Sequence, residues 1–280
     1  MSAYKTRIAD QMLVARLRRK GAVLIEGPKW CGKTTTAEQQ AASVLYMADP
    51  MRKQQNLQAA KINVQQLLMG ETPRLIDEWQ IAPSLWDSVR FEVDHRDGKG
   101  HFILTGSSVP PSMDEIFHSG TGRFAKLKMR TMSLFESGDS SGKVSLSELC
   151  EGKFTPCMNG EVTLLHLAEL IVRGGWPGNL NVPVKNASII AQEYITALLE
   201  NDIYRLDEVK RDVRKMHLLL KSLARNESTI ASVAVLRKDI SGVDGENIDE
   251  VNAFLNGGEF LAMCKMDGLT CSLRYENGHL

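Results

Sequence analysis

The sequence lacks the long hydrophobic segments of membrane and secreted proteins. No apolar run approaches the ~18 residues that a membrane-spanning helix needs, and the N-terminal MSAYKTRIADQ has no apolar signal-peptide core. Lys plus Arg number 34 and Asp plus Glu also number 34, so no net charge attracts the chain to nucleic acid. These absences favour a cytoplasmic protein without membrane contact, and they restrict any DNA contact to a local surface.

Cysteine and histidine are few and scattered. The five cysteines are an odd number and one, Cys31, lies in a glycine-rich turn, which argues against a disulfide framework and fits a reducing compartment. The two later cysteine pairs are spaced C-x6-C, and the six histidines are dispersed, so neither has a usual zinc spacing. No Ser-His-Asp or Cys-His arrangement of a nucleophilic enzyme is legible either.

What the first half of the chain does contain is an alternation of apolar strands and helical segments. Residues 22–26, 43–47, 74–79 and 101–108 read as strands, separated by segments of helical composition. This alternation requires right-handed crossovers, which produce a parallel sheet. The segment RFAKLKM at 123–129 alternates like an exposed strand. The prediction is an α/β fold in which helices flank a parallel sheet.

The second half of the chain has a different composition. The Ser- and Gly-rich ESGDSSGK at 136–143 reads as a flexible connector, and from Val162 onward the chain turns helical. No internal repeat is visible. We therefore place a first domain at 1–140, a linker at 141–160, a smaller and mainly α-helical domain at 161–250, and a C-terminal segment at 251–280.

A phosphate-binding signature follows the first strand. GPKWCGKT at 27–34 satisfies G-x-x-x-x-G-K-[ST], in which backbone N–H groups cradle the β-phosphate, Lys33 neutralises phosphate oxygens and Thr34 supplies a hydroxyl to Mg²⁺. The alternative is a chance match in a turn, but the match falls between a strand and a helix, as this mechanism requires. Trp30 packs either on the nucleotide or on the neighbouring helix. We assign ATP and Mg²⁺ as ligands, and to nucleotide binding we assign Gly27, Pro28, Lys29, Trp30, Cys31, Gly32, Lys33, Thr34 and Thr35.

Two acidic residues end the third strand. A phosphate loop needs a carboxylate on a neighbouring strand to hold Mg²⁺ and a base to orient the attacking water. Asp77 fits the metal role, together with Thr34, and Glu78 fits the role of the general base. Taken alone, the pair is explained as well by a solvated acidic turn. The upstream loop favours the catalytic interpretation.

Hydroxyl residues after the fourth strand and one later arginine are further candidates. Thr105, Ser107 and Ser108 close the strand, and we choose Ser107 as the hydroxyl that binds the γ-phosphate or the lytic water; a capped turn is the alternative. Arg123 follows a glycine-rich turn and can stabilise transition-state charge, either in its own chain or across the interface of a homo-oligomer. A surface or ion-paired arginine is the alternative for this residue.

These segments together resemble the bacterial and archaeal AAA-type ATPases in which an AAA P-loop domain precedes a C-terminal domain of unknown function. The resemblance covers roughly residues 5–240. Its motifs occur in the right order, which makes it specific. They are GPKWCGKTTTAEQQ, RLIDEWQIAPSLWDSVRFEVD, FILTGSS, SGTGRF, MSLFESG and, in the second domain, RGGWPGNL.

The resemblance implies ATP binding and slow hydrolysis. It gives the Walker A role to residues 27–34, the Walker B role to Asp77 and Glu78, a sensor-like role to Ser107 and a finger-like role to Arg123. It also implies a winged-helix-like portion in the second domain, followed by a nuclease-type fold.

The end of the chain departs from this pattern. The resemblance implies a long continuation with strands and an acidic cluster, whereas the last 30 or so residues, from Val251, end the chain. The carboxylates there have no D…E-x-K arrangement. We therefore expect a foreshortened segment at 251–280 and carry over no nuclease activity.

Four functions remain open from the sequence. The first is an Mg²⁺-dependent ATPase in which nucleotide state moves the helical domain. The second is an ATP-gated module with little turnover that binds DNA or a protein through the helical domain, where KRDVRK at 210–215 precedes a segment with Arg237 and Lys238. Solvated helix faces are the alternative for these basic residues. A small-molecule kinase, disfavoured by the lack of a lid arginine cluster, and an inactive remnant of a longer ATPase are the others.

Overall fold

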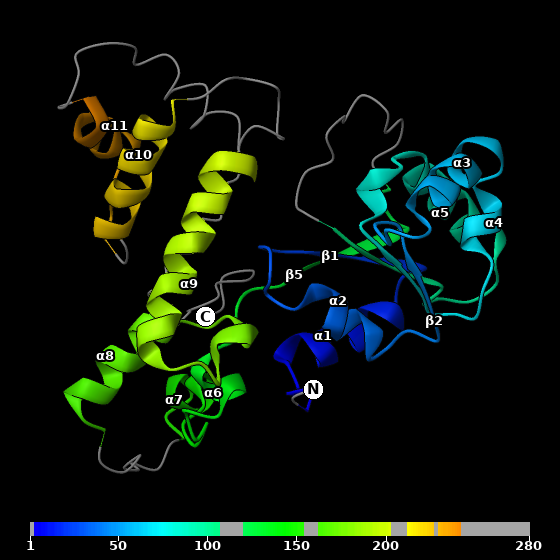
Figure 1. Ribbon diagram of the computed structural model, residues 1–280. Helices are drawn as coiled ribbons and strands as arrows, with labels where there is room; N and C mark the ends of the chain where they lie inside the picture. The colour runs from blue at the N-terminus through cyan, green and yellow to red at the C-terminus, as the bar shows by residue number, and fades with distance from the viewer. Residues whose placement is uncertain (1–2, 107–119, 154–161, 203–211, 227–228, 242–280) are drawn as a thin grey trace. The chain divides into compact units, whose positions relative to one another are not determined.

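The computed structural model describes residues 3–106, 120–153, 162–202, 212–226 and 229–241. The chain forms two compact units, Met1–Met132 and Ser133–Leu280 (Figure 1). The first unit contains a sheet flanked by helices, and the described part of the second unit is helical. Among the described residues, none of the helices combines the length and the apolar character needed to cross a lipid bilayer.

A parallel sheet forms the centre of the first unit (Figure 1). Its strands are β1 (Ala22–Glu26), β2 (Ser43–Tyr46), β3 (Arg74–Asp77), β4 (Phe102–Thr105) and β5 (Phe124–Lys128). They lie in the order β2-β3-β4-β1-β5, and every neighbouring pair is parallel. The predicted parallel sheet is therefore confirmed, and the RFAKLKM segment contributes its edge strand beside β1. Because all strands run the same way, their C-terminal ends meet at one edge of the sheet.

Helices cover both faces of this sheet. One face carries α1 (Ile8–Leu17) and α2 (Lys33–Glu38), and the other carries α3 (Lys53–Ile62), α4 (Gln65–Leu68) and α5 (Ser84–His95). Side chains alternate along a strand. Val23 and Ile25 of β1 therefore join the core with α1, whereas Ala22 and Leu24 join the core with α5.

Two elements of the first unit are shorter than the sequence suggests. The third strand ends at Asp77, because the next residue, Glu78, has a left-handed backbone (φ 56°) and begins the 3-10 turn η1 (Trp79–Ile81). The segment of helical composition between the second and third strands forms two helices, α3 and α4, which are separated at Asn63 and Val64.

The described residues of the second unit form a series of helices, which was predicted from Val162 onward. They are α6 (Leu134–Ser137), α7 (Leu146–Cys150), α8 (Leu164–Arg173), η3 (Pro177–Asn179), α9 (Val184–Ala197), η4 (Leu198–Asp202), α10 (Val213–Arg225) and α11 (Val233–Ser241). A small core joins Leu199, Met216, Leu219 and Ile240. The segment predicted as a linker, 141–160, contains α7, and residues 242–280 lie outside the described residues. The winged-helix-like detail stays a prediction.

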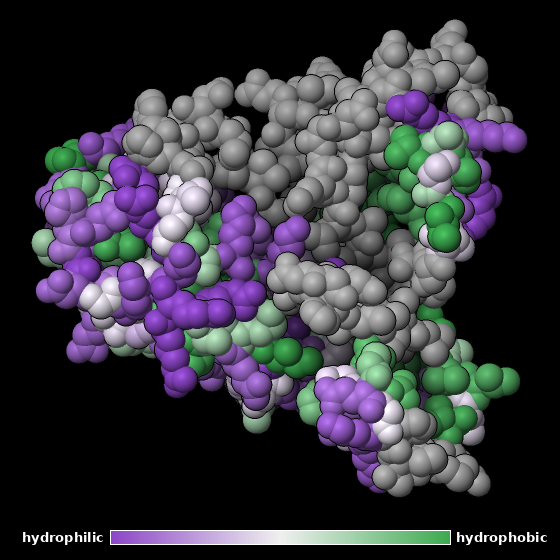
Figure 2. Space-filling model, turned by 180° about the vertical axis from the view of Figure 1, so that it is seen from behind, coloured by the Kyte–Doolittle hydropathy of each residue, from purple (hydrophilic) through white to green (hydrophobic). Residues whose placement is uncertain are grey.

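Hydrophobic side chains reach the surface of the second unit. Figure 2 shows them in green over its helices, where they lie beside purple hydrophilic residues. At the start of α8, Leu164 is 85% exposed and Leu165 is 72% exposed. The first unit instead buries most of its large apolar side chains against the sheet.

Candidate functional site

The glycine-rich turn begins after β1 and ends at the first residue of α2. Two of its residues have left-handed backbones, Trp30 with φ 66° and Gly32 with φ 95°. Gly27 has no room for a side chain, because a Cβ there would lie 2.2 Å from the carbonyl oxygen of Met129. The turn is therefore tightly folded and packs on the chain just after β5. It leads into a helix whose first N–H groups have no partner within the helix.

The side chain of Lys33 folds back across this turn. Its Nζ donates hydrogen bonds to the carbonyl oxygens of Gly27 at 2.8 Å and Pro28 at 2.9 Å, and only 9% of the residue is exposed. An ammonium group so far buried needs such partners, because burying an unpaired charge is costly. The charge therefore lies inside the turn, where the sequence predicts the phosphates.

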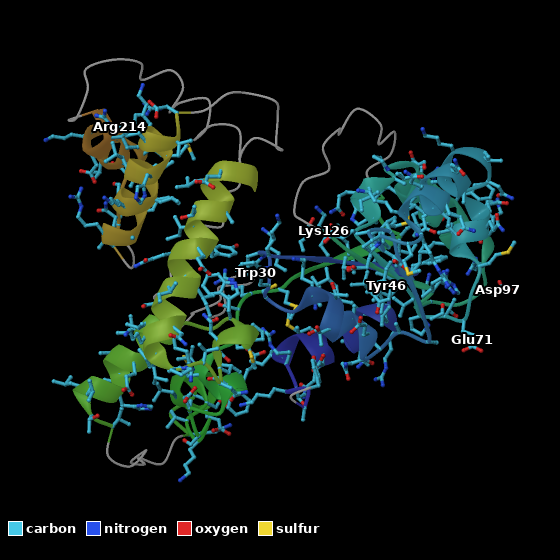
Figure 3. The ribbon with its side chains drawn as sticks, in the orientation of Figure 1. Trp30, Tyr46, Glu71, Asp97, Lys126 and Arg214 are labelled. Atoms are coloured by element: carbon cyan, nitrogen blue, oxygen red, sulfur yellow. The ribbon has the colours of Figure 1, made fainter. Side chains whose placement is uncertain are left out.

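The remaining residues of the turn face in different directions. Lys29, Trp30 and Thr35 are exposed, and Figure 3 shows Trp30 at one end of the unit and Glu71 toward the other. Cys31 is buried, and burial raises the pKa of its thiol above the ordinary value. The thiol is thus kept protonated and is a packing group rather than a nucleophile.

Two hydroxyl groups from different elements donate hydrogen bonds to the same carboxylate oxygen. Oδ1 of Asp77, at the end of β3, accepts hydrogen bonds from Oγ1 of Thr34 at 2.7 Å and from Oγ1 of Thr105 at 2.6 Å. Because β4 lies between β1 and β3, Thr105 is placed between the turn and Asp77, and it is fully buried. Thr34 and Asp77, the two predicted metal ligands, are therefore in direct contact. Hydroxyl and carboxylate oxygens are ligands that suit Mg²⁺.

Glu78 lies beside this cluster. Its carboxylate Oε2 accepts a hydrogen bond from Nε2 of Gln80, which is itself buried in η1. Gln80 packs on Gly106, where a Cβ would approach its Oε1 to 2.1 Å. The predicted general base is thus held by Gln80, a side chain that no sequence motif had singled out.

A second polar pair lies at the same edge of the sheet. The hydroxyl of Tyr46, the last residue of β2, donates a hydrogen bond to Oε1 of Glu38 in α2 at 2.5 Å. This bond and, to a lesser degree, burial raise the pKa of Tyr46 to about 12. Tyr46 pairs with Asp77 in the register of β2 and β3. The signal that identified Asp77, a polar residue ending a strand, applies to Tyr46 as well.

Arg123 lies at the opposite end of the sheet, where the strands have their N-terminal residues. It precedes β5, and its carbonyl oxygen accepts a hydrogen bond from the N–H of Ala22, the first residue of β1. The five residues of β1, at about 3.3 Å each, put the glycine-rich turn about 16 Å further along the strand. Nε of Arg123 donates to Oδ1 of Asp94 in α5 at 2.8 Å, and this contact holds the pKa of Asp94 below its usual range. Within one chain, the structure does not bring Arg123 to the turn.

Other predicted residues lie elsewhere or outside the described residues. Ser107 lies outside them, so the hydroxyl seen at the end of the fourth strand is that of Thr105. Lys210 and Arg211 are also outside them. Arg214 and Lys215 lie in the first turn of α10, which Asp212 caps, and Arg237 and Lys238 lie on α11.

Comparisons with known proteins agree with this architecture. Residues 19–137 match a family model described as an AAA domain, and residues 164–262 match a domain of unknown function (DUF8612). No curated protein matches the chain. The order of the two matches, an AAA domain followed by a domain of unknown function, is the order that the resemblance implied.

Two solved structures illustrate the likeness in fold. The Walker-type ATPase PABY2304 of Pyrococcus abyssi has a TM-score of 0.50 and 14% identity, over 94% of this chain and 90% of that chain. AMPPCP-bound DnaA from Aquifex aeolicus has a TM-score of 0.43 and 12% identity, over 92% and 94% of the two chains. At this level of identity, the first likeness shows that the fold is that of a P-loop ATPase.

Proposed function

We propose that this chain, whose residues 19–137 match an AAA domain, binds ATP together with Mg²⁺ and hydrolyses it. One observation carries the proposal. The hydroxyl groups of Thr34 and Thr105 both donate hydrogen bonds to Oδ1 of Asp77, next to a glycine-rich turn that holds the ammonium of Lys33. A solvated acidic turn has no reason to bury a threonine against its carboxylate. An Mg²⁺–nucleotide site does, because metal ligands need partners that orient them.

The turn and Lys33 are proposed to bind the phosphates. In the absence of nucleotide the ammonium of Lys33 bonds to the carbonyl oxygens of Gly27 and Pro28. Phosphate oxygens are stronger acceptors for an ammonium group than neutral carbonyl oxygens. Binding of ATP therefore turns this ammonium from the backbone to the β- and γ-phosphates without requiring a large movement of the turn.

Thr34 and Asp77 are the residues that would hold Mg²⁺, and the ion, when bound, neutralises charge on the phosphate oxygens. The donor set fits, because Mg²⁺ is usually bound by one or two protein oxygens together with phosphate and water. Thr105 has no direct contact with the ion in this scheme. Its hydrogen bond fixes the orientation of the Asp77 carboxylate.

Glu78 is proposed as the general base that orients the attacking water. It directly follows Asp77 in the chain, and Gln80 holds its carboxylate until the substrate is in place. The charge of the transition state is stabilised by Arg123 of a second copy of this chain, because the distance along β1 separates this residue from its own turn. The active form is then a homo-oligomer.

The helical unit is proposed to respond to the nucleotide. Its described helices expose hydrophobic side chains, among them Leu164 and Leu165, and apolar surface of this kind suits contact with a macromolecular partner. ATP binding and hydrolysis would move this unit and alter its contact with a protein or DNA partner.

The experiment that tests the function is phosphate release by the purified protein and by Glu78→Gln. We expect Glu78→Gln to bind ATP with unchanged affinity and to lose turnover by at least about a hundredfold, because a general base contributes roughly 10² to 10⁴ to the rate. The matched control is Glu71→Gln, whose side chain is exposed and lies away from Trp30 (Figure 3). Wild-type protein that binds ATP without releasing phosphate would remove the enzymatic part of the proposal.

A further inference from the structure

Arg7 connects the start of α1 to the glycine-rich turn. It is 5% exposed, and its guanidinium donates from Nη1 to the carbonyl oxygen of Cys31 at 2.8 Å and from Nη2 to the carbonyl oxygen of Arg130 at 2.9 Å. The first contact spans 24 residues and the second spans 123 residues. One side chain thus joins the middle of the turn to the chain just after β5.

The contact with Cys31 constrains the direction of the next N–H group. In a planar trans peptide the C=O and the N–H point in opposite directions. A carbonyl of Cys31 that is held by Arg7 therefore turns the N–H of Gly32 away from Arg7. The left-handed backbone of Gly32 lets the chain enter α2 from this orientation.

Arg7 is itself held in place by neighbouring polar groups. Its backbone N–H donates to Oδ2 of Asp10 at 2.7 Å, and Oδ1 of Asp10 accepts from the hydroxyl of Tyr4 at 2.7 Å. The same hydroxyl lies 3.1 Å from Oγ1 of Thr36 in α2. Burial raises the pKa of Tyr4 to about 12, so its hydroxyl keeps its proton at neutral pH. The N-terminal segment therefore contacts both the glycine-rich turn, at Cys31, and the helix that follows it, at Thr36.

A close packing contact supports the same arrangement. The carbonyl of Met129, the residue before Arg130, occupies the space that a Cβ of Gly27 would need. The first residue of the turn therefore packs on the segment that Arg7 also binds. Movement of the carbonyl of Cys31 would require either breaking a charge-assisted hydrogen bond or shifting this segment.

We propose that Arg7 is a positioning residue for phosphate binding. It holds the Cys31 carbonyl toward its own guanidinium, on the side away from the phosphates, so that the N–H of Gly32 faces the phosphates. The inference rests on the proposed binding of ATP at this turn. It assigns to Arg7 no contact with the nucleotide. Its role is to fix the backbone before the nucleotide arrives, and this reduces the ordering that binding would otherwise require.

The test compares Arg7→Lys and Arg7→Met with a matched control, Arg16→Lys. Arg16 lies in α1 and donates to the carbonyl oxygen of Lys126 in β5 at 3.0 Å and to that of Met12 in its own helix at 3.3 Å. A lysine has a single nitrogen and cannot reproduce the two hydrogen bonds that the planar guanidinium donates to separate carbonyl oxygens. We expect Arg7→Lys to weaken the affinity for a fluorescent ATP analogue with Mg²⁺ by about tenfold and Arg7→Met to weaken it more, while Arg16→Lys leaves it unchanged.

Stoichiometry separates positioning from loss of folded protein. If Arg7 served stability alone, its variants would contain fewer binding-competent molecules, and those molecules would bind with the wild-type dissociation constant. Positioning instead predicts full stoichiometry with a weakened dissociation constant. Wild-type affinity in both Arg7 variants, or an equal loss in Arg16→Lys, overturns the inference. Wild-type protein that binds no ATP overturns the proposed function itself.

Discussion

The sheet has two edges across its strands, one at their C-terminal ends and one at their N-terminal ends, and these edges differ in how their polar side chains are held. At the C-terminal edge, Lys33 and Thr105 are buried and bonded to neighbouring groups. At the N-terminal edge, the side chains of Arg123 and Asp94 are 43% and 32% exposed and pair with each other. The polar groups at the first edge are buried and held by their partners, whereas the second edge carries an exposed charge pair.

Under the proposed function, this difference explains how one chain can contain both the proposed phosphate site and a distant arginine. An exposed ion pair contributes little to stability, because solvent screens it. Arg123 can therefore leave Asp94 at small cost when another chain supplies a triphosphate. The buried groups cannot rearrange so freely, since each would lose partners away from water. Substitutions at the two edges should consequently have different signatures.

The largest effect is expected at the C-terminal edge, from Lys33→Ala. The substitution removes the ammonium that would contact the phosphates, so ATP affinity should fall by about a hundredfold, and turnover should be lost with it. Equilibrium titration with labelled ATP measures the first effect and phosphate release the second. Lys61→Ala, at an exposed position at the end of α3, is the control. Retained affinity in Lys33→Ala would contradict the assignment of the turn.

The next effect is expected at the N-terminal edge, from Arg123→Ala. Because the residue is distant from the turn of its own chain, ATP affinity should stay unchanged while turnover falls by about a thousandfold, the scale of an arginine that stabilises transferring phosphate. Phosphate release at saturating ATP is the measurement. Arg19→Ala is the control, because this exposed arginine follows α1 and its Nε donates to the carbonyl oxygen of Ala15 in that helix.

Mixing the two defective proteins sharpens this comparison. Lys33→Ala lacks the phosphate contact but retains Arg123, and Arg123→Ala has the opposite defect. If Arg123 acts across an interface, the mixture should recover part of the turnover that each protein lacks alone. An Arg123→Ala protein with normal turnover, or a mixture without recovery, would argue that the arginine has only its structural ion pair.

The sequence was sufficient where the chemistry is local. The spacing of Gly27, Gly32, Lys33 and Thr34 predicted a turn between a strand and a helix, and the alternation of apolar segments predicted the parallel sheet, which the structure confirms. A carboxylate directly after an apolar strand was enough to select Asp77. The contacts that these predictions need are between residues close in the sequence or at the ends of regular elements.

The sequence was insufficient where long-range contacts decide. Arg7 could not be selected, because its carbonyl partners lie 24 and 123 residues away. The position of Arg123 at the far edge became clear only when β5 paired with β1. The contact of Thr105 with Asp77 could not be foreseen for the same reason, since nothing in the sequence shows that the fourth strand lies between the first and the third.

The smallest effect is expected from Thr105→Val, which tests this strand order directly. The substitution keeps the shape of a fully buried side chain and removes its hydrogen bond to Asp77, which retains the bond from Thr34. A less constrained carboxylate should hold Mg²⁺ more weakly, so the Mg²⁺ concentration for half-maximal turnover should rise by about tenfold, the scale of one hydrogen bond to a charged group. Thr105→Ser keeps the hydroxyl and should behave like the wild type. If valine and serine give the same Mg²⁺ dependence, the buried threonine is a packing residue and the orientation of Asp77 depends on Thr34 alone.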